Sequence, residues 1–234
     1  MALCAVTPAP IGAADRGTGR ADPLAARSSD GRAAASLQRN GADPAGGWSY
    51  TITWRRPRES KSVTFASIIE HPLELRLTAS GDRATIVGWA SGTGVFAFDV
   101  VDVVAGKLLA EVPCYQPAVS PSGRYVAFVQ WFPPHLTSLA RRSAVYRIAD
   151  AARMRHDAAR DLIRYDAGTA VYPTSPVTVA RGSADVAQIH MMAGTFRWAG
   201  ESRVSFDDLY RNRASRVHVR IAKSGTYSVA AGAR

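Results

Sequence analysis

The stretch AVSPSGRYVAFVQW, at residues 118–131, decides the fold because it places a tight turn directly before a strand. Pro121 sets the backbone for a type I turn, Ser120 can hydrogen-bond the backbone that follows, and Gly123 tolerates the left-handed conformation needed to leave the turn. The residues after the turn are apolar on both faces of the predicted strand, with Tyr125, Ala127 and Val129 on one face and Val126 and Phe128 on the other. Such a strand is predicted to lie between two sheets.

Two further stretches repeat this pattern, LTASGDRATIVGW at residues 77–89 and FRWAGESRVSFDDL at residues 196–209. In each copy a small or polar turn precedes an arginine (Arg83, Arg124 and Arg203), and a β-branched or aromatic run follows it. The arginines are separated by about one and about two repeats of roughly 40 residues, a period that suits one four-stranded propeller blade.

The repeated stretch resembles the β-propeller repeats of the TolB and WD-like family, whose units carry a Ser-Pro-Asp-Gly-Arg turn before an apolar strand. Ser120, Pro121, Gly123 and Arg124 match that turn, and Ser122 stands where the family has aspartate. The resemblance covers roughly residues 77–232. It implies an all-β, propeller-like fold of four-stranded blades, incomplete or small, with three to four blades, and it implies a fold more than a function.

The organisation of the rest of the chain follows from composition. Residues 1–47 contain few large apolar side chains, so a disordered or signal-like tail is expected there, with disorder from about residue 15. The propeller-like domain is expected at residues 48–234, where the segments 47–54 and 62–77 supply strands of a partial blade. The Ala-rich segment 149–165, which pairs Arg153 with Asp157 at i,i+4, is predicted to be an inserted helix.

The first residues, MALCAVTPAPIGAA, resemble the end of a secretory signal but lack its basic start. Either the start codon is placed too far downstream or the segment is an ordinary flexible tail. We expect a periplasmic or secreted protein, and otherwise a cytoplasmic one. No run of apolar residues is long enough for a membrane-spanning helix.

The net charge of +10 raises the possibility of a nucleic-acid-binding surface. The basic residues are mostly arginines, in a chain that is also rich in alanine, and that bias can come from genome base composition alone. They are scattered, with short groups at 55–58, 141–142 and 211–220, and are not interleaved with stacking aromatics on one face. Nucleic acid is therefore not expected as the partner, and it stays an alternative.

No constellation of residues predicts catalysis, a metal site or a cofactor. The five histidines, His71, His135, His156, His190 and His218, do not pair at metal-ligand spacing, and no Gly-x-Ser-x-Gly elbow occurs. The pair Asp207-Asp208 could bind a cation, although solvated turn residues are the simpler interpretation. Cys4 and Cys114 form no disulfide framework, and Cys114 is expected to be buried.

The expected interaction site is the loop formed by Trp131, Phe132, Pro133, Pro134 and His135, because aromatics held by prolines lose little entropy on binding. The alternative is that Trp131 and Phe132 cap the core of the blade. Three repeats and one partial blade do not easily close a ring, so another protein or another chain is the expected partner, with the oligomeric state open.

The function expected from the sequence is a non-enzymatic, exported, propeller-like interaction module without a cofactor. The alternatives are the propeller portion of a prolyl-oligopeptidase-like peptidase that lacks its catalytic domain, and a basic nucleic-acid-binding surface.

Overall fold

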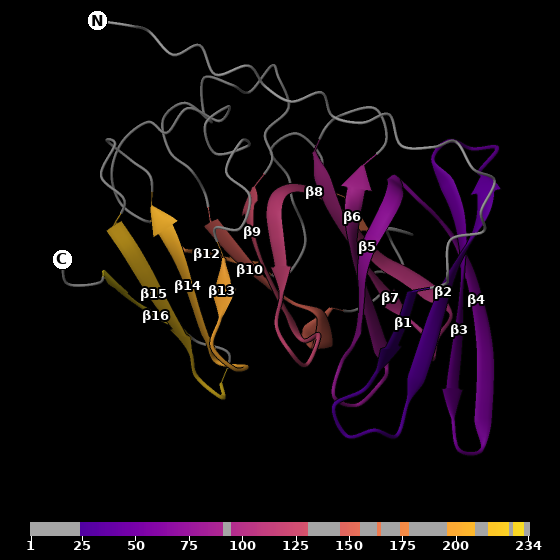
Figure 1. Cartoon of the computed structure of the whole chain (residues 1–234), viewed down its shortest axis with the longest axis horizontal. Coiled ribbons are helices and arrows are strands. Elements are labelled where there is room, and N and C mark those ends of the chain that lie inside the picture. The colour runs from indigo at the N-terminus through magenta and orange to yellow at the C-terminus, as the bar shows by residue number, and fades with distance from the viewer. Residues whose placement is uncertain are drawn as a thin grey trace, which may run out of the picture.

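A computed structural model describes residues 24–90, 95–130, 146–154, 163–164, 174–177, 196–208, 215–224 and 227–231, most of which lie in antiparallel strands (Figure 1). The first four strands form one sheet in the order β1-β2-β3-β4. Their bounds are β1 Leu24–Arg27, β2 Ala34–Ala42, β3 Trp48–Arg56 and β4 Glu59–Ser67. We call this sheet blade 1.

A longer sheet follows in the order β12-β10-β9-β8-β7-β6-β5, and the short β11 pairs in parallel with β8. Its strands are β5 Ile69–Leu77, β6 Arg83–Ala90, β7 Phe96–Asp102, β8 Lys107–Val119, β9 Tyr125–Gln130, β10 Tyr146–Asp150, β11 Ile163–Arg164 and β12 Thr174–Val177. The 3-10 helix η2, Ala151–Arg153, follows β10.

Strand β8 divides this sheet into two units of four strands. Its first part, up to Cys114, pairs with β7, and its second part, from Cys114 to Val119, pairs with β9. Between Tyr115 and Ala118 the register shifts, and Gln116 has a φ of 48°. An irregularity of this kind bends a strand and increases its local twist. We therefore call β5-β6-β7-β8 blade 2 and β8-β9-β10-β12 blade 3.

The last sheet, blade 4, has the order β13-β14-β15-β16. Its strands are β13 Arg197–Trp198, β14 Arg203–Asp208, β15 Ser215–Ile221 and β16 Tyr227–Ala231. Figure 1 shows blades 1 and 4 on opposite sides of the molecule, with the long sheet between them. The all-β, propeller-like fold predicted from the repeat is confirmed.

The core lies between successive blades, as the two-faced strand at residues 125–129 predicts. Tyr125, Ala127 and Val129 belong to the hydrophobic cluster that includes residues of blade 4, whereas Val126 and Phe128 belong to a second cluster with residues of blade 2. Phe98 of β7 meets Phe128 with 5.1 Å between ring centroids. Both faces of β9 are therefore buried, and the prediction for this strand is confirmed.

The turn before the second strand is built in the same way in blades 1, 2 and 3. Ser28, Thr78 and Ser120 each donate a backbone N–H to the carbonyl five residues later, and their side-chain hydroxyls accept the N–H of that same residue. The glycine three residues into each turn, Gly31, Gly81 or Gly123, has a φ between 71° and 73°. The left-handed conformation at that position favours glycine.

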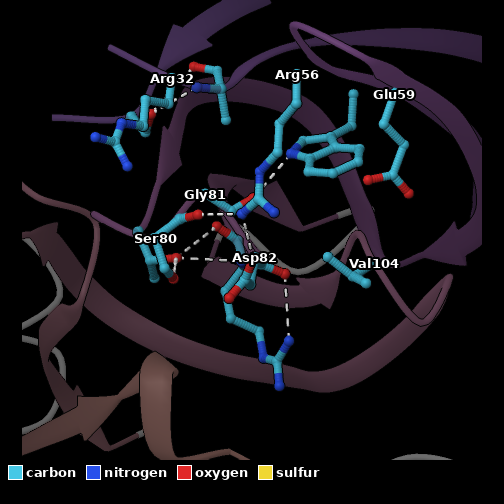
Figure 2. A network of polar contacts seen from close by, with 12 residues as sticks. Arg32, Arg56, Glu59, Ser80, Gly81, Asp82 and Val104 are labelled. Atoms are coloured by element: carbon cyan, nitrogen blue, oxygen red, sulfur yellow. Dashed lines mark hydrogen bonds and ion pairs between the residues drawn. The ribbon is translucent and has the colours of Figure 1, made fainter. Parts of the chain in front are cut away.

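Polar contacts at these turns also join neighbouring blades. Figure 2 shows Arg56, at the end of β3, reaching the turn of blade 2, where its guanidinium donates to the Ser80 carbonyl and to Asp82. The buried Trp54 indole donates to the Gly81 carbonyl at 2.8 Å. Between blades 3 and 4, the Ser122 backbone N–H and hydroxyl both donate to the Glu201 carboxylate. The turns therefore hold the blades together as well as starting the strands.

The expected disorder before residue 48 is wrong for residues 24–47, because β1 and β2 complete blade 1. Ala33, Ala35 and Leu37 are buried in the main hydrophobic cluster. Small side chains suffice there because large, buried side chains of the neighbouring β3 lie beside them: Trp54 is the cross-strand partner of Ala35, and Ile52 that of Leu37. A low content of large residues in one segment therefore does not prevent folding. Residues 1–23, including the signal-like segment, lie outside the described residues.

The helix predicted at 149–165 is wrong at both of its ends. Ala149 and Asp150 finish β10, Ala151–Arg153 form only a short 3-10 helix, and Ile163–Arg164 pair with β8. Asp150 explains the start, since its carboxylate caps the turn by accepting the Ala152 N–H and also accepts both hydrogen bonds from the Arg124 guanidinium. Residues 155–162 of the predicted helix lie outside the described residues.

Candidate interaction face

The interaction loop predicted from the sequence, Trp131 to His135, lies outside the described residues. The described histidines are His71 and His218, which are both exposed and lie on different blades. Within the described ranges no group of three His, Cys, Asp or Glu side chains could hold a metal ion. The part of the chain that the structure describes also contains no helix with the length and apolar character needed to cross a membrane.

Two buried carboxylates, which sequence reasoning missed, face each other in blade 2. Asp99 and Glu111 are cross-strand partners on β7 and β8, and Asp99 is fully buried. Glu111 accepts the backbone N–H of Ile68, the residue between β4 and β5, at 2.9 Å. Cys114 lies buried nearby, and burial raises the pKa of its thiol. Glu111 thereby ties blade 2 to the chain that links it to blade 1, which is a structural role.

Two of the three repeat arginines also have structural roles. Arg83 begins β6 and pairs with Asp102, its direct cross-strand partner on β7, at 2.7 Å. Arg124 donates both of its hydrogen bonds to Asp150 at 2.9 and 3.1 Å, and this contact raises the pKa of its guanidinium. Each ion pair joins two neighbouring strands of one blade, close to the repeated turn.

The third repeat arginine has a different environment. Arg203 begins β14, as Arg83 begins β6, but its direct cross-strand partner on β15 is Arg220. Both side chains are exposed, and no carboxylate in the described part of the chain pairs with either of them. Blade 4 thus carries Arg220 at the position where blade 2 carries Asp102, the ion-pair partner of Arg83. Like charges directly opposite each other destabilise a sheet.

The two arginines belong to a basic face on the outside of blade 4. Along β15 the side chains of Val217, Val219 and Ile221 are buried against the core, and those of Arg216, His218 and Arg220 are exposed. The period-2 pattern of a strand places these exposed side chains on one face. The register adds Arg197 and Arg203 to it. We call Arg197, Arg203, Arg216, His218 and Arg220 the arginine face.

One carboxylate neutralises part of this face. Asp207 on β14 accepts from Arg216 at 2.9 Å and lies 3.6 Å from Arg197. The cation site considered at Asp207-Asp208 is not supported, because the Asp207 carboxylate is already shared by two arginines. Arg203, Arg220 and the exposed imidazole of His218 are left facing solvent on the described part of the face.

The spacing of these side chains suits carboxylates presented by an extended peptide. Alternate residues of a strand lie about 6.8 Å apart, both on β15 and on any peptide laid along it. Arginine presents a planar fork of donors that matches a carboxylate. No aromatic side chain lies on the described part of this face, so it offers no platform for stacking bases.

Sequence reasoning found part of this site. Residues 216–221 alternate charged or polar with apolar side chains, and the arginine group at 211–220 includes Arg216 and Arg220. The missing signal was the long-range register, which brings Arg203 opposite Arg220. With that register, blade 4 is seen to lack the cross-strand aspartate that pairs with Arg83 in blade 2.

No protein-family model and no curated protein sequence matches the chain. Among solved structures, it is similar to the β-propeller domain of the Trilobed protease from Pyrococcus furiosus, with a TM-score of 0.41 and 9% identity over 89% of this chain and 55% of that one. It is also similar to TolB from Acinetobacter baumannii, with a TM-score of 0.36 and 14% identity over 90% of this chain and 43% of that one. The chain spans about half the length of these proteins, and the likeness concerns the fold alone.

Proposed function

We propose that this protein is a non-enzymatic, exported, propeller-like module that binds an acidic segment of another protein on the arginine face of blade 4. The observation that carries the proposal is the cross-strand pair Arg203 and Arg220, which has no carboxylate partner in the described residues. Such a pair costs the sheet stability unless an anion neutralises it. Places where a sequence breaks a local rule without compensation are expected to be functional.

An acidic protein segment fits better than nucleic acid. The described face contains arginines, one imidazole and small side chains such as Ser205, Ser228 and Ala230, without an aromatic ring. Single-stranded nucleic acid binds through stacked bases as well as phosphate contacts. The carboxylates of an acidic segment can be bound by guanidinium groups alone. Arg216 already binds a carboxylate in this way on the same face, that of Asp207.

The test is a fluorescence anisotropy titration of a labelled alternating Glu-Ser peptide with the full chain at low salt. We expect saturable binding that weakens as salt is added, since exposed charges are screened. The variant Arg203→Gln/Arg220→Gln should bind roughly tenfold or more weakly, because it loses two charge-assisted hydrogen-bonding groups.

The matched control is Arg58→Gln/Lys107→Gln, which removes the same charge from exposed positions of blades 1 and 2. It should retain the affinity of the wild-type protein for the peptide. Equal weakening in both variants would show that only net charge matters. Tighter binding of a single-stranded oligonucleotide than of the peptide would replace the acidic partner with nucleic acid.

Export is the part of the proposal that rests on the signal-like residues 1–14. We expect the polypeptide recovered from outside the cytoplasm of its host to have a mass that lacks those residues or that derives from a longer precursor. A species of 25.0 kDa confined to the cytoplasm would remove export and leave the binding proposal in place.

A further inference from the structure

A second basic site lies on blade 1, on the face directed away from blade 2. The side chains on the inner face are apolar and buried, whereas the outer face carries small polar residues such as Ser36, Thr53 and Ser62. A hollow of about 430 Å³ opens on this outer face across β1, β2 and β3. The hollow is more open than enclosed, so a ligand bound in it stays partly exposed to solvent.

The register explains the hollow. Arg27 on β1, Ala34 on β2 and Arg55 on β3 form one cross-strand row, in which Ala34 is the direct partner of both arginines. Two strand spacings, roughly 10 Å, separate the backbones of the two arginines. The short side chain of Ala34 adds little bulk between them, and both arginines line the hollow.

The next row of the hollow provides neutral donors. Ala25, Ser36 and Thr53 are cross-strand partners, and all three line the hollow. The Ser36 and Thr53 hydroxyls can donate to an oxygen, whereas Ala25 adds no bulk. The hollow is therefore lined by two arginines, two hydroxyl-bearing residues and several alanines.

Within the described residues, no carboxylate lines the hollow. Asp30, which is close to Arg27 in the sequence, is held in the turn of blade 1, where it accepts from the Ser28 hydroxyl and from the Arg32 backbone N–H at 2.9 Å. The hydrogen bond from Ser28 is the main cause that lowers the pKa of Asp30. The Asp30 carboxylate therefore stabilises the turn. Within the described residues, neither Arg27 nor Arg55 forms an ion pair.

We infer that this hollow binds a phosphate group, held between Arg27 and Arg55 and supported by Ser36 and Thr53. Arginine forks match the geometry of phosphate oxygens and bind them through paired hydrogen bonds. The hollow is larger than one phosphate, so the same chemistry can come from free phosphate or from a small phosphate monoester. This site is independent of the arginine face, which lies on another blade.

The experiment is isothermal titration calorimetry of the full chain with inorganic phosphate and with O-phosphoserine, in a phosphate-free buffer. We expect saturable binding, weakened roughly tenfold or more in Arg27→Gln/Arg55→Gln. Tighter binding of O-phosphoserine would identify an organic phosphate as the preferred ligand, and equal affinities would identify free phosphate; both results support the site.

Two further variants separate the site from general charge effects. Ala34→Leu keeps both arginines but fills the space between them, so it should also weaken binding roughly tenfold or more. The variant Arg58→Gln/Lys107→Gln removes the same charge from exposed positions outside the hollow and should bind phosphate as the wild-type protein does. A thermal melt of each variant checks that it is folded. The inference is overturned if the wild-type protein shows no saturable binding, if a folded Ala34→Leu variant binds normally, or if Arg58→Gln/Lys107→Gln weakens binding as much as Arg27→Gln/Arg55→Gln.

Discussion

At the scale of single residues, the turn glycines show how closely the blades approach each other. Gly123 has a φ of 73°, and a Cβ added there would lie 2.8 Å from the carbonyl oxygen of Leu77 in blade 2. Gly106 has nearly the same φ, 71°, but a Cβ there would meet nothing within 4 Å. Substituting Gly106 therefore measures the cost of backbone strain alone, whereas substituting Gly123 measures that strain together with a steric clash.

We predict that Gly106→Ala lowers the free energy of unfolding by about 1–2 kcal/mol, the cost of placing a side chain in the left-handed region. Gly123→Ala should lose about 1–3 kcal/mol more, because the backbone of Leu77 has to move. Urea denaturation of both variants measures this difference. Equal losses would mean that the turns of blades 2 and 3 do not touch.

Cys114 gives a second prediction at this scale. The side chain is fully buried and burial raises its pKa, so the reactive thiolate is disfavoured. In a Cys4→Ser variant, the native protein should react with a thiol reagent at pH 8 far more slowly than the urea-unfolded protein. Equal rates would show that the interface between blades 2 and 3 opens readily.

At the scale of elements, the repeated turn is the unit that the sequence encodes best. The prediction that residues 125–129 are buried on both faces is confirmed, because period-2 patterning is local and needs no knowledge of distant partners. The alignment of the arginines was wrong by one position. Gly81 and Gly123 hold equivalent places in their turns, so Asp82 corresponds to Arg124, and Arg83 corresponds to Tyr125.

A fourth copy of the turn was missed in the sequence. Residues 28–32, SSDGR, contain the aspartate, glycine and arginine of the family pattern and form the turn of blade 1. The alanines that follow do not look like a strand in isolation. They are stabilised by the large side chains of β3, which composition analysis of the segment alone does not take into account.

The turn hydroxyl provides a prediction at the element scale. Thr78 accepts the Arg83 N–H at 3.1 Å and is buried, so Thr78→Val leaves that donor without a partner at almost unchanged volume. We expect a loss of about 1–3 kcal/mol in the free energy of unfolding. Thr78→Ser should lose less, because serine fills the same position in blades 1 and 3. A valine variant as stable as the serine variant would contradict a role for the hydroxyl.

At the scale of the whole molecule, the blades are joined by apolar interfaces, and the two outermost faces are polar. The outer face of blade 1 is rich in serine, threonine and arginine, and that of blade 4 is rich in arginine. Closing a ring by pressing these faces together would bury Arg203 and Arg220 without carboxylate partners, and uncompensated buried charges cost several kcal/mol. Both candidate binding sites lie on these outer faces.

In the structure the first blade begins with β1 at Leu24, before the domain boundary at residue 48 that the sequence predicted. Deleting residues 1–47 removes β1 and β2 together with the buried Ala35 and Leu37, and it leaves β3 with an unpaired edge. We expect this deletion to lower the midpoint of thermal unfolding or to make the protein insoluble. Deleting residues 1–23 keeps every described strand and is the control. An unchanged midpoint after the longer deletion would show that blade 1 is dispensable.

The candidate sites could be predicted only in part, because each is made by cross-strand register. The sequence shows that residues 55–58 and 211–220 are basic, but the pairing of Arg27 and Arg55 with Ala34, and of Arg203 with Arg220, depends on contacts between separate strands. The predicted loop at 131–135 was chosen from local composition and lies outside the described residues.

The most direct test of the proposed function is the affinity of the acidic peptide for the single variant Arg220→Asp, which gives blade 4 the aspartate that answers Arg83 in blade 2. We predict that this variant binds the Glu-Ser peptide at least tenfold more weakly and unfolds at a higher urea concentration, since a like-charge pair becomes an ion pair. Undiminished peptide affinity in a folded Arg220→Asp variant would contradict the assignment of the arginine face as the binding surface.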